Sequence, residues 1–304
     1  MKKLQYIIAL VLLSGSLFAQ QDAMYSQYMF NMLAVNPAYA GNREVLSITG
    51  LTRAQWVGLK GAPVSNTVSI DAPIRNKHIG LGAQLFNEKI GVTSSTGFYG
   101  SYAYRIRLKK STLAFGLQGG MVHYTANYTQ VILDRTTVNT DKSFKENASV
   151  LMPALGAGVF FSDDDYYIGL SVPGLFSTHI TFGNEIEVNK DNHLFAMAGY
   201  VFPLNKDFKL KPSVLLKAVT GAPLELDANI NLWMYDRLAL GLSYRTGDAA
   251  VGMVEVQVAP NFRVGYAYDY GLTDLSYFHS GSHELILRYE FGYTKDKILT
   301  PRYF

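Results

Sequence analysis

The sequence predicts an all-β protein, a transmembrane outer-membrane β-barrel of 14 antiparallel strands. Three observations predict this fold. An apolar segment behind basic residues starts the chain, polar and apolar side chains alternate along most of the remainder, and short connections alternate with long ones. Together they distinguish a barrel from a soluble secreted protein and from a helical membrane protein.

The first 19 residues have the organisation of a secretory signal peptide. Lys2 and Lys3 precede an apolar run over residues 6–13, and small residues lead to Ala19. The run is about half of the ~20 residues that a membrane-spanning helix needs, and no run of 18 apolar residues follows. We therefore expect residues 1–19 to be removed on export, which leaves a secreted protein or a barrel.

Alternation along residues 224–235 favours the barrel. Its even positions are apolar and its odd positions are mostly polar: Leu224, Leu226, Ala228, Ile230, Leu232 and Met234 against Glu225, Asp227, Asn229, Asn231, Trp233 and Tyr235. Residues 237–245, 262–270 and 283–292 alternate in the same way. A period of two places one face of a strand in lipid and the other in water, and a helix does not sort residues like this.

The chain contains 14 such runs. An even number lets the last strand of an antiparallel barrel pair with the first. The predicted strands cover residues 43–57, 64–74, 78–88, 92–108, 112–125, 151–162, 166–172, 193–202, 208–219, 224–234, 237–245, 250–258, 262–270 and 283–292.

The connections test this assignment independently. Every join after an even-numbered strand is short, and the long joins, over residues 126–150, 173–192 and 271–282, all follow odd-numbered strands. Outer-membrane barrels have short periplasmic turns and longer extracellular loops. We therefore expect a barrel over residues 43–293 and a periplasmic tail over residues 294–304.

The composition excludes several classes of protein. The chain has no cysteine, so disulfides, thiolate metal sites and an acylated lipoprotein anchor are excluded. A net charge of +3 without a basic run argues against nucleic acid as a partner. The six histidines are scattered without metal-ligand spacing, so we expect no catalytic residues, no metal and no cofactor. A membrane hydrolase using His279 and Ser280 would need a base fixed onto its nucleophile.

The lumen of a 14-stranded barrel is wider than its own side chains fill. Inward-facing positions carry both charge signs, which favours lateral bracing over a single-sign ion filter. Residues 20–42 hold aromatic side chains among polar ones, so we expect a periplasmic or lumen-plugging segment there. Its candidate lumen residues are Tyr25, Tyr28, Phe30, Asn36 and Pro37.

The three long loops carry apolar side chains of the type that anchors protein interfaces. The candidate partner-binding residues are Phe144 in the first, Leu175, Phe176, Ile180 and Phe182 in the second, and Leu275, Tyr277 and Phe278 in the third. The alternative is that these loops fold over the mouth of the barrel, because either arrangement covers the apolar side chains.

Several motifs resemble the PorP/SprF family of type IX secretion-associated outer-membrane proteins. They are YSQYMFN (residues 25–31), NPAYAG (36–41), RAQWVG (53–58) with GAP (61–63), SIDAP (69–73), GSHE (281–284) and PRYF (301–304). The resemblance implies an integral protein of a Bacteroidetes-type outer membrane, without enzymatic activity, that works with secretion or gliding machinery. It also implies a partner, a secreted cargo protein with a type B C-terminal sorting domain, alongside translocon and periplasmic components.

These inferences lead to one functional hypothesis and one alternative. The hypothesis is that the barrel binds or anchors its cargo at the cell surface through the extracellular loops. The alternative is a passive uptake barrel with an N-terminal plug, similar to fatty-acid channels.

Overall fold

The structure is a computed structural model that describes residues 25–74, 77–130, 147–175, 178–182, 186–190, 192–219 and 221–291. For residues 178–182 and 186–190 it describes the backbone alone. The predicted signal peptide, Phe144, Phe176 and the C-terminal tail lie outside the described residues.

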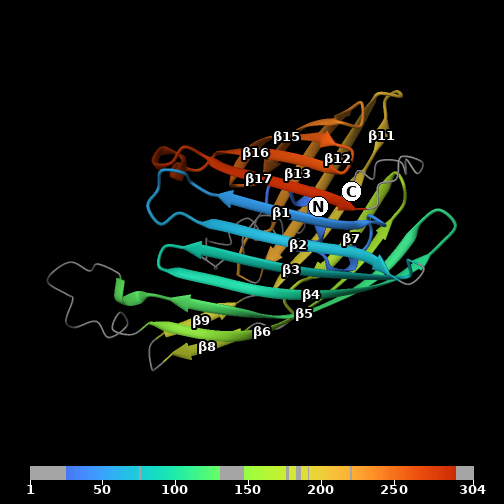
Figure 1. The fold of residues 1–304 in the computed structure, drawn as a ribbon. Coiled ribbons are helices and arrows are strands. Elements are labelled where there is room, and N and C mark those ends of the chain that lie inside the picture. Colours follow the sequence, from blue (N-terminus) through green and yellow to red (C-terminus); the bar gives the residue numbers. More distant parts are fainter. Residues whose placement is uncertain are drawn as a thin grey trace, which may run out of the picture.

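The chain forms a closed antiparallel barrel of 14 wall strands, as predicted, and pairing of the first strand, β1, with the last, β17, closes it (Figure 1). β10 and β11 form one wall strand that is interrupted at Val201. The wall consists of β1 (Leu46–Ala54), β2 (Val64–Ile74), β3 (Ile79–Ile90), β4 (Thr93–Arg107), β5 (Thr112–Ala126), β6 (Ala148–Ser162), β7 (Tyr166–Val172), β10 (His193–Tyr200) with β11 (Phe202–Pro203), β12 (Phe208–Val219), β13 (Glu225–Met234), β14 (Leu238–Arg245), β15 (Ala249–Ala259), β16 (Phe262–Gly271) and β17 (Ser282–Phe291).

The register of the sheet sets the width of the barrel. One circuit along paired residues, starting at Ala148 of β6, returns to β6 at Ser162, 14 residues further on. This stagger equals the number of strands, and strands of such barrels tilt by about 35–45° from the axis. A cylinder of this size leaves space inside that its own side chains do not fill.

The largest differences from the sequence prediction lie at β1 and in the loop 173–192. β1 is shorter than residues 43–57, because Glu44 and Trp56 have φ values of 59° and 47°, which end an extended strand. The predicted loop 173–192 contains a hairpin of β8 (Thr178–Phe182) and β9 (Ile186–Lys190), a separate two-stranded sheet. Alternation in this hairpin covers only five residues per strand, which is too short to separate from an irregular loop.

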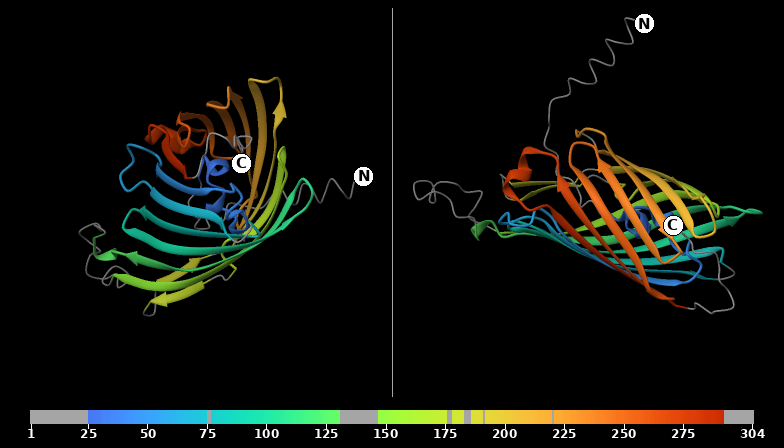
Figure 2. Two further views of the ribbon diagram at one scale, coloured as in Figure 1. Left: turned by 45° about the vertical axis from the view of Figure 1, so that its right-hand side comes forward. Right: turned by 90° about the horizontal axis from the view of Figure 1, so that it is seen from above.

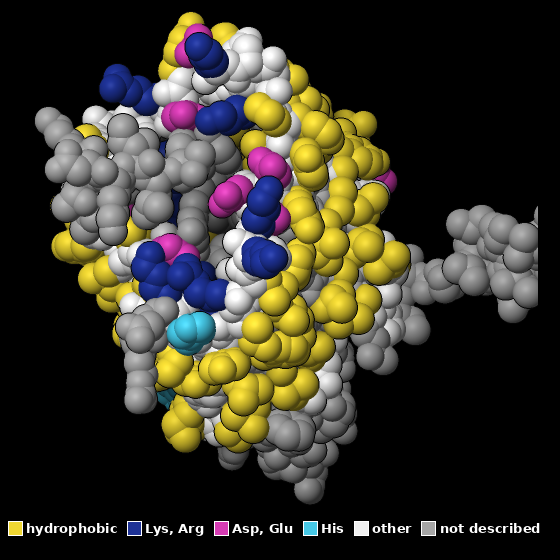
Figure 3. Space-filling view, turned by 90° about the vertical axis from the view of Figure 1, so that its right-hand side faces the viewer, with side chains coloured by type: hydrophobic (Ala, Val, Ile, Leu, Met, Phe, Trp, Pro, Cys, Tyr) yellow, Lys and Arg dark blue, Asp and Glu magenta, His cyan; other side chains and the backbone are white. Residues whose placement is uncertain are grey.

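The two faces of the wall differ as the alternation predicts. Outward side chains are apolar and exposed, with Leu117, Leu242 and Val258 more than 60% exposed, whereas inward ones include buried Lys211 and Lys217. In Figure 3 hydrophobic side chains cover the flank of the barrel, and charged ones gather at the end that faces the viewer. Such a wall matches lipid outside and a polar lumen inside.

The two mouths of the barrel are unequal. The outer mouth carries the connections 55–63, 127–147, 173–192 and 272–281, whereas no connection at the inner mouth exceeds four residues, as in 204–207. By the rule for outer-membrane barrels, the outer mouth is extracellular and the inner mouth is periplasmic. Among the described residues, no helix is long and apolar enough to cross a membrane.

Candidate functional site: the lumenal segment and the outer loops

Residues 25–45, here called the lumenal segment, lie inside the barrel (Figure 2). They form three single turns of 3-10 helix, η1 (Tyr28–Phe30), η2 (Met32–Ala34) and η3 (Pro37–Tyr39). Asn36 begins the third turn, where its side chain accepts the Ala38 N–H at 2.9 Å and Pro37 supplies a preset φ. The segment is therefore compact without a long helix.

Glycines of the wall receive the backbone of the lumenal segment. A Cβ atom on Gly80 would collide with the Ala40 carbonyl, and one on Gly116 would collide with the backbone of Ala38. Only glycine permits such a close approach. These contacts hold the lumenal segment against the part of the wall that β3 to β6 form. Side chains of the segment extend from there to the opposite wall.

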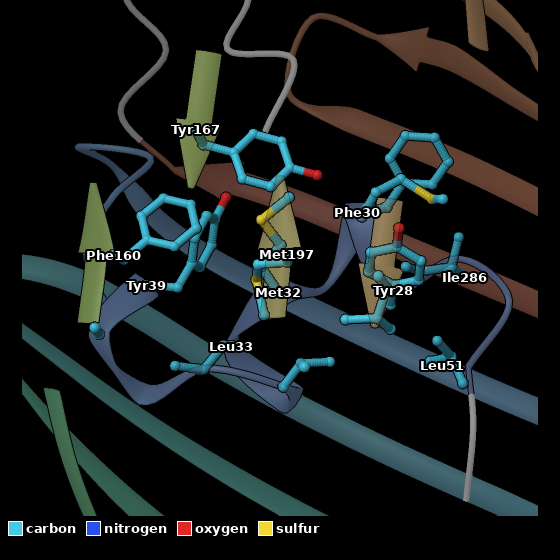
Figure 4. Close-up of a cluster of buried hydrophobic side chains, with 14 of the residues drawn as sticks. Tyr28, Phe30, Met32, Leu33, Tyr39, Leu51, Phe160, Tyr167, Met197 and Ile286 are labelled. Atoms are coloured by element: carbon cyan, nitrogen blue, oxygen red, sulfur yellow. The ribbon is translucent and has the colours of Figure 1, made fainter. Parts of the chain in front are cut away.

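Apolar side chains of the lumenal segment fill the centre of the barrel (Figure 4). The Tyr39 ring packs edge-on against Phe160, with centroids 5.4 Å apart, and Phe30 packs edge-on against Trp233 at 6.3 Å. Tyr28 is 1% exposed, and the Asn229 amide donates a 2.9 Å hydrogen bond to its hydroxyl. Burial raises the pKa of the Tyr28 phenol well above its ordinary value, so this hydroxyl stays neutral.

An ion cluster holds the outer end of the segment. The Ser26 hydroxyl donates to Asp269 at 2.7 Å and accepts hydrogen bonds from Arg53 at 2.8 Å and Arg245 at 3.1 Å. The N–H groups of Ser26 and Gln27 each donate to a different oxygen of Glu284 at 2.8 Å. Each charged side chain in this cluster pairs with one of opposite sign, because burial of an unpaired charge costs a large free energy.

A second ion cluster holds the inner end. Asp71 accepts the Gly41 N–H at 2.8 Å, and Arg105 donates to the Gly41 carbonyl at 2.6 Å. Next to them Glu44 pairs with Lys77 at 2.7 Å and with Arg107. The chain then enters β1.

The structure thus places all five candidate lumen residues inside the barrel. Tyr28, Phe30, Asn36 and Pro37 are buried, and Tyr25 is half-buried, with its hydroxyl 2.7 Å from Thr67 Oγ1. Sequence reasoning missed Ser26 and Gln27 as site residues, because uncharged polar side chains give neither an apolar pattern nor a charge to pair.

The third long loop presents two exposed aromatic side chains. Tyr277 and Phe278 end the 3-10 helix η6 (Asp274–Phe278) and are 85% and 71% exposed, whereas Leu275 is half-buried. Leu175, on the second loop, is 42% exposed. Ile180 and Phe182 lie in β8, where only the backbone is described.

The loop 272–281 is fixed to the loop 55–63. The Val57 N–H donates to the Gly281 carbonyl at 2.8 Å, and the Ser280 N–H donates to the Val57 carbonyl at 2.7 Å. The Trp56 ring lies 6.4 Å from that of His279, whose Nδ1 accepts the Gly281 N–H. The exposed apolar side chains of both loops, here called the outer platform, are Val57, Leu59, Leu272, Tyr277 and Phe278.

The described residues contain no group of three or more His, Cys, Asp or Glu side chains arranged to hold a metal ion. His279, considered for a hydrolase, uses its Nδ1 atom for the Gly281 N–H.

The fold and the filled lumen define an integral outer-membrane β-barrel whose residues 25–45 lie within its own wall. The sequence matches the family described as "Type IX secretion system membrane protein PorP/SprF" over residues 17–289. The chain belongs to the PorP/SprF family, as its motifs suggested, and is an outer-membrane protein associated with type IX secretion.

The solved structures that resemble this one are also β-barrels, and their sequence identity to this chain is low. The CymD monoaromatic hydrocarbon channel is 11% identical, with a TM-score of 0.49 and coverage of 90% of this chain and 94% of CymD. Omp33 of Acinetobacter baumannii is 9% identical, with a TM-score of 0.48 and coverage of 82% and 98%. The translocator domain of the autotransporter NalP from Neisseria meningitidis is 12% identical, with a TM-score of 0.42 and coverage of 88% and 98%. No curated protein matches the sequence.

Proposed function

We propose that this protein is a sealed docking barrel of the type IX secretion system that holds an exported protein at the cell surface. The proposed partner is a cargo protein with a type B C-terminal sorting domain, bound by the outer loops. The observation that supports this best is the exposure of Tyr277 and Phe278 on a loop that backbone hydrogen bonds fix to its neighbour.

Exposed aromatic side chains on a fixed loop favour binding for two reasons. Burying a large apolar side chain contributes about 1.5–3 kcal/mol, and aromatic residues are enriched in interfaces. A loop that is already ordered loses little conformational entropy when a partner docks. The outer platform thus supplies both contact area and preorganisation.

The docking test replaces Tyr277 and Phe278 together by Ala in the full-length protein. We expect the cargo to appear in the medium instead of on the cell surface, while the amount of folded barrel is unchanged. The matched control is Tyr235→Ala, which removes a 64% exposed aromatic side chain at the inner mouth. Normal surface cargo in the double variant would contradict docking by the platform.

The burial of residues 26–42 supports a sealed lumen and disfavours the uptake alternative. The test is swelling of liposomes that contain the purified protein, in a solution of a small sugar. We expect no swelling with the full-length barrel, and swelling with a folded variant that lacks residues 25–42. Rapid swelling with the full-length barrel would instead support the uptake channel.

A further inference from the structure

The lumenal segment runs through the barrel in a defined direction. Ser26 binds Glu284, the third residue of β17, and Asp269, the third residue from the end of β16. Both positions lie beside the loop 272–281 of the outer mouth. Glu44, at the other end, binds Lys77 in the turn between β2 and β3 and Arg107 at the end of β4, both at the inner mouth.

We propose that the chain enters the lumen from the outside, so that the residues directly ahead of Tyr25 emerge on the cell-surface side. β1 starts at the inner mouth, which faces the periplasm. A segment that precedes β1 would therefore be expected to come from the periplasmic side, and the proposed direction is the opposite one.

The packing below Ser26 argues against the opposite route. From Ser26 to Asn42 every side chain but that of Ala34 is buried, and Met29, Met32 and Ala40 are fully enclosed. A second pass of the chain towards the inner mouth would need this occupied space. Tyr25, by contrast, is partly exposed and contacts Thr67, three residues from the outer end of β2. The free route from Tyr25 is therefore outward.

The ion cluster around Ser26 explains what keeps this end at the outer mouth. Ser26 binds four side chains from four strands: Arg53 of β1, Arg245 of β14, Asp269 of β16 and Glu284 of β17. Hydrogen bonds to charged groups are stronger than those between neutral groups, so these contacts hold Ser26 firmly in place. They fix the point at which the chain leaves the lumen.

The absence of cysteine from the sequence allows a direct test. Single-cysteine variants of the full-length protein are treated, in intact cells, with a polyethylene-glycol maleimide too large to pass porins. Ala23→Cys reports the chain ahead of Tyr25. Tyr277→Cys reports the outer mouth and Asp164→Cys the inner mouth, and heat-modified migration on gels verifies that each barrel is folded.

We expect Ala23→Cys to be labelled in intact cells to the same extent as Tyr277→Cys, with Asp164→Cys labelled only after the outer membrane is permeabilised. Labelling of Ala23→Cys only after permeabilisation would overturn the proposal, and so would failure to label it under both conditions. The result does not depend on the docking function, because labelling reports topology alone.

Discussion

The backbone N–H of Ser26 donates to Glu284 Oε2 at 2.8 Å, although the two residues are 258 positions apart. The same carboxylate accepts the Gln27 N–H and pairs with Arg53 at 3.2 Å. Arg53 belongs to the first strand of the barrel and Glu284 to the last, and these two strands pair. One carboxylate therefore joins the lumenal segment to the seam where the barrel closes.

Replacing Glu284 by Gln should destabilise the barrel. Arg53 keeps its pairing with Asp269, but the cluster loses one negative charge, and breaking a buried ion pair costs up to about 3–5 kcal/mol. We expect a lower temperature for the heat-induced shift in gel migration. Asp236→Asn, which weakens the partly exposed pair with Lys209 at the inner mouth, is the control and should cost about 1 kcal/mol. Equal midpoints for the two variants would contradict this role of Glu284.

Replacing Gly80 by Ala should displace the lumenal segment. The added methyl group meets the backbone of Ala40, which cannot rotate away as a side chain does, and overpacking of this kind costs about 1–3 kcal/mol. We expect a lower unfolding midpoint together with faster liposome swelling. Gly50→Ala is the control, because a Cβ there meets nothing within 4 Å. If both variants behave like the parent protein, the close contact between Gly80 and Ala40 does not hold the lumenal segment in place.

Replacing Gly281 by Ala should weaken docking without opening the lumen. Gly281 has a φ of +87°, and its Cβ would lie 2.6 Å from the Tyr268 hydroxyl and 2.7 Å from the Asp269 carbonyl. The loop must shift, so we expect a loss of surface-bound cargo like that of the Tyr277 and Phe278 double variant. Gly221→Ala carries similar strain, at a φ of +80°, but meets nothing within 4 Å. Cargo retention equal in both glycine variants would count against the fixed platform.

Alkaline pH should destabilise the protein partly through Tyr28. Burial raises the pKa of Tyr28 in the folded barrel, whereas an unfolded tyrosine titrates near pH 10. Below about pH 10 both states hold the proton and the contribution to stability is complete. Above it the unfolded state ionises first, so stability falls as pH rises. We expect the unfolding midpoint of Tyr28→Phe to fall less than that of the parent between pH 8 and pH 11, and equal slopes would exclude this effect.

Much of the fold could be predicted because its main determinant is local. Alternation in residues such as Leu238, Leu240 and Leu242 fixes which side of a strand meets lipid, and the lengths of connections fix which mouth is which. The β8–β9 hairpin is not predicted, because five residues per strand are too few for alternation to stand out from an irregular loop. The candidate loop residues Tyr277 and Phe278 were identified from apolar character alone, and their binding role stays a prediction.

The sequence by itself determined an outer-membrane barrel, its strand number, its family and an aromatic segment suited to a lumen. Only the tertiary structure decided where that segment lies and in which direction it runs. The reason is physical: Ser26 meets Glu284, and Ala40 meets Gly80, only when the sheet has closed and brought distant strands within a few ångströms. Closure of the barrel depends on the register of every strand pair. The pattern of residues along one strand therefore does not predict contacts between residues that are far apart in the sequence.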